Sequence, residues 1–97
     1  MVAIKFSGHG VGVTQGLHDF TTEKFARVQK HAANATSIQV FFNVNKLSQE
    51  AEATLHIPGA EIFASAESDD MYKTIDLLVG KIIRQLDKHK EKSRITK

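Results

Sequence analysis

Three neighbouring segments of the chain, residues 38–44, 50–57 and 61–66, alternate apolar and polar side chains along their length. A period of two residues is typical of strands that bury one face and expose the other. Short turns separate the segments, at residues 45–46 and at Pro58-Gly59. Strands joined by short turns pair antiparallel, so the sequence predicts a three-stranded meander whose apolar face other elements must cover.

The segments on either side of the meander are predicted to form a fourth strand and two helices that cover its apolar face. Residues 2–6 alternate like a strand, whereas residues 15–32 and residues 71 to about 89 repeat apolar side chains at helical spacing. Thr14 and residues 68–70 offer the hydroxyls and carboxylates that favour helix starts. A helix between the first two strands makes those strands parallel. We therefore predict an α+β fold of order β-α-β-β-β-α, with two helices packed on one face of a four-stranded mixed sheet.

Length and composition indicate one domain, residues 1–97, ending in a basic tail at about 91–97. With 41% hydrophobic and 25% charged residues, the composition is that of a globular protein. No apolar run is long enough to span a membrane, and we expect neither an export signal nor a membrane partner. The sequence has no cysteine and its histidines are scattered, so we expect no disulfide, metal, cofactor, small-molecule substrate or catalytic residue.

Charge is distributed unevenly along the chain. Residues 1–80 hold six basic and nine acidic side chains, a net charge of −3, whereas residues 81–97 hold seven basic and two acidic side chains, a net charge of +5. A basic segment at one end predicts a polyanionic partner, although a solubilising tail has the same composition.

The last predicted helix separates apolar from basic residues. Its apolar arc contains Met71, Tyr72, Ile75, Leu78, Val79, Ile82, Ile83 and Leu86, and its opposite side carries a basic row of Lys81, Arg84, Lys88 and Lys92. Like charges on successive turns repel one another, so the row does not serve the stability of the helix. Phosphate binding explains the row better than an ordinary solvated surface does.

The first predicted helix carries a smaller basic row of Lys24, Arg27 and His31, with Lys30 nearby. If the helices lie side by side, we expect the two rows to flank one groove that binds the phosphates of RNA. The outer face of the sheet carries Glu50, Glu52 and Glu61 and should repel nucleic acid.

Three large apolar residues fall outside the predicted core. Phe41 and Phe63 should both point to the outer face of the sheet, where they form either a minor apolar patch or a small protein contact. Leu77 falls near the basic side of the last helix.

Several stretches resemble the bacterial hibernation promoting factor family, which includes ribosome-associated inhibitor A and the sigma-54 modulation proteins. The matching stretches are residues 14–17, 24–27, 53–56 and 61–67, and above all Asp-Met-Tyr at residues 70–72 followed by Arg-Gln-Leu-Asp-Lys-His-Lys at residues 84–90. The resemblance covers nearly the whole chain, and the length is similar to that of the short form of the family.

The resemblance implies a fold like that of a double-stranded-RNA-binding domain and a function without catalysis. It implies binding to the small ribosomal subunit in the messenger and transfer RNA channel, inhibition of translation in stationary phase, ribosome pairing together with ribosome modulation factor, and a cytoplasmic location. A free-standing double-stranded-RNA-binding module is the alternative. The expected ribosomal-RNA contacts, from the basic rows and the resemblance together, are Lys24, Arg27, Lys30, His31, Lys81, Arg84, Lys88, Lys90 and Lys92.

Overall fold

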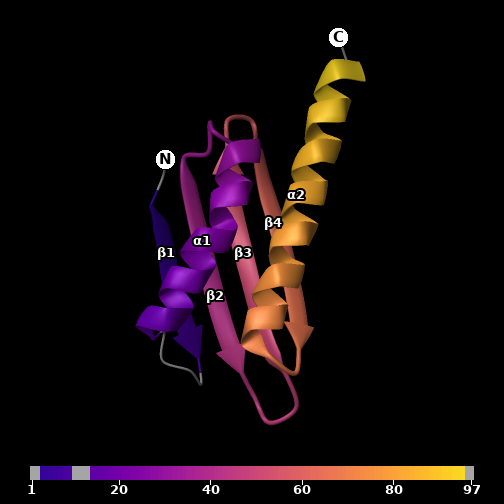
Figure 1. Cartoon of the computed structure of the whole chain (residues 1–97). Helices are drawn as coiled ribbons and strands as arrows, with labels where there is room; N and C mark the ends of the chain where they lie inside the picture. Colours follow the sequence, from indigo (N-terminus) through magenta and orange to yellow (C-terminus); the bar gives the residue numbers. More distant parts are fainter. Residues whose placement is uncertain (1–2, 10–13, 96–97) are drawn as a thin grey trace.

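The computed structural model describes residues 3–9 and 14–95, with side chains as far as His89. Its elements are β1 (Ile4–His9), α1 (Gln15–His31), β2 (Ser37–Val44), β3 (Gln49–Ile57), β4 (Ala60–Ser68) and α2 (Met71–Ile95). The predicted order is therefore confirmed. Figure 1 shows both helices on one side of the sheet, with α1 nearer β1 and α2 nearer β4.

The sheet has the order β1-β2-β3-β4. β1 pairs with β2 in parallel, and the other two pairings are antiparallel, as the meander predicted. Gly59 has a φ of 82° in the turn between β3 and β4, a conformation that glycine adopts without the steric cost of a Cβ atom.

The first strand differs from its prediction. Residues 2–6 were expected, but β1 runs from Ile4 to His9, and residue 2 lies outside the described part of the chain. The pairing with β2 continues through Gly8 opposite Phe42, because a neighbouring strand supplies hydrogen bonds that hold even a glycine extended.

Small side chains seat α2 closely on β3 and β4. Ala51 pairs with Ala66 and Ala53 pairs with Ala64, and all are buried beneath the helix. Large side chains of α2 fill the space above them, namely Ile75, Leu78, Val79, Ile82 and Leu86, each at most 2% exposed. This seating places one flank of α2 along β4.

Two residues at the start of α2 behave differently from prediction. Tyr72 was assigned to the apolar arc but is 46% exposed, because it lies at the margin of that arc. Its ring packs edge-on against the ring of Phe20, with 4.8 Å between the two centroids. Asp70, rather than Ser68, caps the helix: its carboxylate accepts a hydrogen bond from the Tyr72 N–H at 3.4 Å. The Ser68 hydroxyl instead contacts the buried Thr74 hydroxyl at 2.6 Å.

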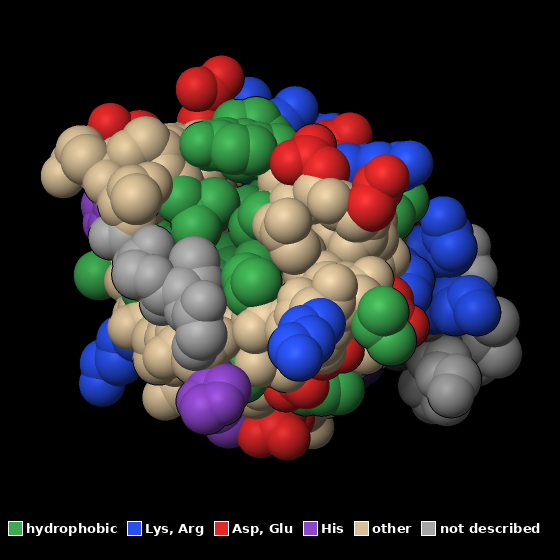
Figure 2. Space-filling view, turned by 90° about the horizontal axis from the view of Figure 1, so that it is seen from below, with side chains coloured by type: hydrophobic (Ala, Val, Ile, Leu, Met, Phe, Trp, Pro, Cys, Tyr) green, Lys and Arg blue, Asp and Glu red, His purple; other side chains and the backbone are tan. Residues whose placement is uncertain are grey.

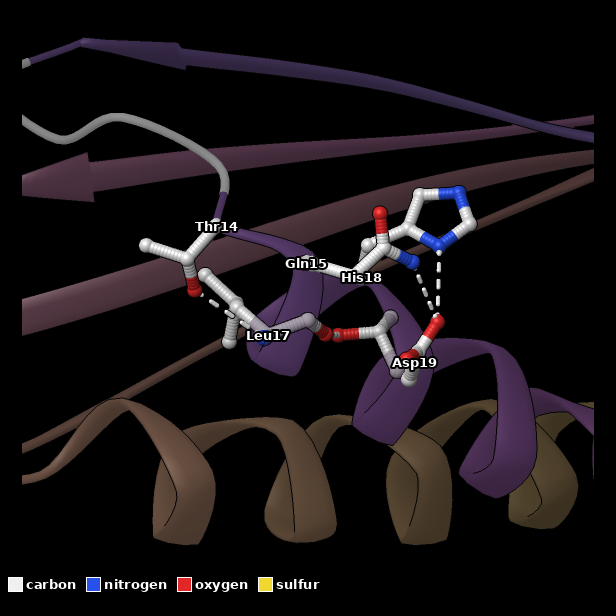
Figure 3. A network of polar contacts seen from close by, with 6 residues as sticks. Thr14, Gln15, Leu17, His18 and Asp19 are labelled. Atoms are coloured by element: carbon white, nitrogen blue, oxygen red, sulfur yellow. Dashed lines mark hydrogen bonds and ion pairs between the residues drawn. The ribbon is translucent and has the colours of Figure 1, made fainter.

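The start of α1 follows the prediction. The Thr14 hydroxyl accepts a hydrogen bond from the Leu17 N–H at 3.1 Å, as Figure 3 shows. In the next turn the Asp19 carboxylate accepts a hydrogen bond from Gln15 at 2.7 Å and lies 3.5 Å from His18 Nδ1. The His18 ring packs on Phe6 of β1 at 4.6 Å, which ties the helix start to the sheet.

Candidate nucleic-acid interface

The flank of α2 that faces α1 is acidic. Lys24 Nζ lies 3.4 Å from Asp76 Oδ1, and His31 Nδ1 lies 3.3 Å from Asp87 Oδ1. Lys24 and His31 of α1 therefore meet the acids of α2 and not its basic row. The prediction of one groove flanked by two basic rows is wrong.

Helix geometry explains this error. At about 100° per residue, Asp76 and Asp87 lie about 120° around α2 from Lys81 and Lys88. α1 packs along the acidic flank, whereas β4 lies along the basic one. Periodicity places a row on one side of its helix, but it does not say which neighbour that side meets.

The other cations of the first row remain exposed. No described carboxylate lies within ion-pair distance of Arg27 or Lys30, and both side chains face solvent. The pair of Lys24 with Asp76 is itself partly exposed, so water screens it and it contributes only about 0–1 kcal/mol. The α1 cations thus form a second, weaker basic surface beside the helix pair.

Side chains of α2 hold the open edge of β4. Lys81 Nζ donates a hydrogen bond to the Ser65 carbonyl at 2.8 Å, and Gln85 Nε2 donates one to the Phe63 carbonyl at 2.7 Å. β4 is the last strand of the sheet, so no neighbouring strand satisfies these carbonyls. The two side chains protect the edge from pairing with another chain and fix α2 against it.

A groove runs beside these hydrogen bonds. It has a volume of about 450 Å³ and is lined by Phe63, Ala64, Ser65, Lys81, Arg84, Gln85 and Lys88. We call it the β4–α2 groove. It contains three cations of the predicted basic row, and the floor of the groove belongs to a strand rather than to α1.

The β4–α2 groove is strongly positive. No described carboxylate lies within ion-pair distance of Lys81, Arg84 or Lys88. Figure 2 shows Lys and Arg side chains gathered along the right of the molecule, on the flank that α2 forms. Cations that are not neutralised internally attract phosphate, and guanidinium and ammonium groups both bind it well.

The outer face of the sheet is acidic, as predicted. Glu50 lies opposite Glu67 across the β3–β4 pairing, and Glu52 lies two residues further along β3 on the same face. The three carboxylates border a hollow of about 220 Å³ that Lys81 reaches from the side. Glu61 lies at another point of this face, 3.4 Å from His56. The outer face of the sheet therefore carries the carboxylates, whereas the flank of α2 along β4 carries cations.

The described residues contain no cluster of three or more histidine, aspartate or glutamate side chains with the geometry of a metal site. None of their helices is apolar over a stretch long enough to cross a membrane. The side chains of Lys90 and Lys92 lie outside the described residues.

The composition of the groove was only partly predicted. Lys81, Arg84 and Lys88 belong to the predicted basic row, whereas Phe63, Ser65 and Gln85 were not assigned to the site. The alternation of residues 61–66 did predict that the Phe63 ring is exposed, and it is 51% exposed. Phe41, 38% exposed, and Leu77, 46% exposed, also lie outside the core as expected.

Comparisons with known proteins agree with this fold. The family model described as Sigma 54 modulation protein / S30EA ribosomal protein matches residues 4–94. Two curated relatives named ribosome hibernation promoting factor are 52% identical to this chain. The Azotobacter vinelandii protein aligns over 92% of this chain and 83% of its own length, and the Pseudomonas putida protein over 94% and 89%. The Escherichia coli K12 protein of the same name is 42% identical over 92% of this chain and 94% of its own length.

Solved structures of two proteins also share the fold of this chain. A ribosomal subunit interface protein from Coxiella burnetii has a TM-score of 0.86 and 41% identity, and the match covers 91% of this chain and 97% of that one. The N-terminal domain of Thermus thermophilus Protein Y has a TM-score of 0.82 at 22% identity, covering 92% and 99%, which is a likeness of fold.

Proposed function

The chain belongs to the Sigma 54 modulation protein / S30EA ribosomal protein family, and from this premise we propose that it is a ribosome hibernation factor. It binds the small ribosomal subunit in the channel for messenger and transfer RNA and thereby inhibits translation in stationary phase. Its mechanism is occupancy of that channel rather than catalysis. The relatives named for ribosome hibernation and for the ribosomal subunit interface support this proposal.

One structural observation carries the proposal. Three cations, Lys81, Arg84 and Lys88, line the β4–α2 groove without a described carboxylate in ion-pair reach. Ribosomal RNA is a folded polyanion, and cations that are not neutralised internally release its counterions on contact. These three residues are the proposed primary contacts.

The remaining predicted contacts extend this surface. Arg27 and Lys30 offer exposed cations on α1, and Lys24 and His31 lie beside them in pairs with aspartates. By sequence, Lys92 continues the basic row along α2, and Lys90 is a contact implied by the family resemblance. We propose that Lys24 and His31 contact RNA more weakly than the cations of the groove, because Asp76 and Asp87 offset part of their charge.

The broader setting follows from the same family. We propose that the protein acts in the cytoplasm on ribosomes and promotes their pairing together with ribosome modulation factor.

Sedimentation of stationary-phase lysate tests the proposal. The wild-type protein is expected to migrate with the small subunit and with paired ribosomes, and an Arg84→Ala/Lys88→Ala variant is expected to shift to the soluble fraction. A Lys5→Ala/Lys46→Ala variant removes the same charge from exposed positions away from the groove and should migrate like wild type.

Two outcomes would contradict the proposal. A wild-type protein found only in the soluble fraction excludes a ribosomal role and favours the free-standing double-stranded-RNA-binding module. A groove variant that stays with the ribosome as firmly as the Lys5→Ala/Lys46→Ala variant would show that the β4–α2 groove is not the contact surface.

A further inference from the structure

The β4–α2 groove contains an aromatic ring beside its cations. Phe63 alternates with the buried Ile62 and Ala64, so its side chain leaves the core, and it is 51% exposed. Its neighbour across the sheet is Thr54, and no strand lies on its other side. The ring therefore lies on the outer face of the sheet at its free edge, which borders the groove.

Hydrogen bonds fix the strand backbone that carries this ring against α2, which carries the cations. Gln85 binds the carbonyl of Phe63 itself, and Lys81 binds the carbonyl of Ser65, two residues along the same strand. Arg84 and Lys88 project from the same turns of α2 into the same groove. The two elements that carry the ring and the charges are thus held together before a ligand arrives, which lowers the cost of binding.

The other exposed phenylalanine has different surroundings. Phe41 lies in a separate hollow on the outer face, lined also by Lys5, Gln39, Glu52 and Thr54. One lysine and one carboxylate line this hollow, so it lacks the excess positive charge of the β4–α2 groove. Exposure alone does not distinguish the two rings, but only Phe63 lines a groove together with three cations.

We propose that the β4–α2 groove binds a single-stranded stretch of RNA, with its phosphates on Arg84 and Lys88 and one unstacked base against the Phe63 ring. Cations along the backbone and an aromatic side chain under a base are the combination by which proteins hold unpaired RNA. Bases inside an A-form duplex are stacked on one another and cannot reach such a ring. The inference rests on the proposed function, since it names which form of ribosomal RNA the groove accepts.

Fluorescence anisotropy with a labelled oligoadenylate tests this inference. Phe63→Ala should weaken binding by about 5- to 150-fold, the range for loss of one stacked base. Phe41→Ala, the matched control, should bind like wild type, and Phe63→Tyr should retain most of the affinity because it keeps the ring. Circular dichroism checks that each variant is folded.

An abasic strand of the same length and charge tests the same contact from the side of the RNA, and together with Phe63→Ala it forms a double-mutant cycle. The wild-type protein should bind it about 5- to 150-fold more weakly than oligoadenylate, and Phe63→Ala should then cost nothing further. Lys88→Ala should weaken both strands alike, because it removes a phosphate contact. A duplex of equal charge should be insensitive to Phe63→Ala.

Several results would overturn the inference. It fails if Phe63→Ala binds oligoadenylate as wild type does, if the loss is equal on the abasic strand, or if wild type binds both strands equally. These results leave the sedimentation of the Arg84→Ala/Lys88→Ala variant unaffected, so failure of base stacking is distinguishable from failure of the ribosomal role.

Discussion

The salt dependence of ribosome binding tests the arrangement of charges most directly. Each contact between a cation and a phosphate contributes about 0.7 to 0.9 to the slope of log affinity against log salt. Arg84 and Lys88 both line the β4–α2 groove, and neither has a described carboxylate within ion-pair distance. The Arg84→Ala/Lys88→Ala variant should therefore have a slope smaller by about 1.4 to 1.8.

This change in slope is large enough to measure. Between about 50 and 200 mM salt, the affinity of the wild-type protein should fall about 7- to 12-fold more than that of the variant. The assay is a titration of labelled protein with purified small ribosomal subunits at several salt concentrations. Unfolding curves of both proteins confirm that the exposed substitutions leave the fold intact.

The α1 row provides the comparison that could refute the reasoning. Lys24 and His31 lie beside Asp76 and Asp87, so a Lys24→Ala/His31→Ala variant removes cations whose charge is already partly balanced. Its slope should change by less than about 0.7. An equal decrease of the slope in both double variants would favour a single binding groove between the helices. An unchanged slope in the Arg84→Ala/Lys88→Ala variant would show that the β4–α2 groove does not contact RNA.

Two substitutions test the seating of α2. Ile82 is 1% exposed in the core, so Ile82→Ala should lower the free energy of unfolding by about 2–5 kcal/mol, measured by urea denaturation. A negligible loss would mean that the helix presents a different side to the sheet. Ala64 is 5% exposed in the strand under α2, so Ala64→Leu should overpack this contact and cost about 1–3 kcal/mol, measured by thermal unfolding. It should also weaken ribosome binding, because α2 carries the cations of the groove; unchanged stability would show that the helix does not rest closely on this strand.

Patterns within single elements were reliable where one dominant period was present. The alternation in residues 38–44 gave both the strand and the burial of Ile38, Val40 and Phe42. The helical period of α2 predicted its apolar arc correctly except at the margin, where Tyr72 packs against Phe20 and is half exposed. β1 was shifted by several residues, because pairing with β2 extends a strand into a segment that glycines would otherwise favour as a loop.

Charge partners were the least predictable feature. Lys24 and Asp76 are 52 positions apart, and nothing in either local pattern indicates that they meet. Gln85 and Phe63 likewise come together only because α2 lies along the edge of β4. Contacts between elements depend on the rotation and order of those elements in the packed domain, which local periodicity does not contain.

The order of strands and helices, the apolar side of each and the row of Lys81, Arg84 and Lys88 are properties of neighbouring residues, so the amino-acid order alone determines them. The packed domain decided which side of α2 meets α1 and which meets β4, because alanine pairs in β3 and β4 seat the helix there. That choice turns Asp76 and Asp87 toward α1 and leaves the cations beside Phe63. The location of the groove therefore follows from tertiary packing, whereas its positive charge follows from the sequence.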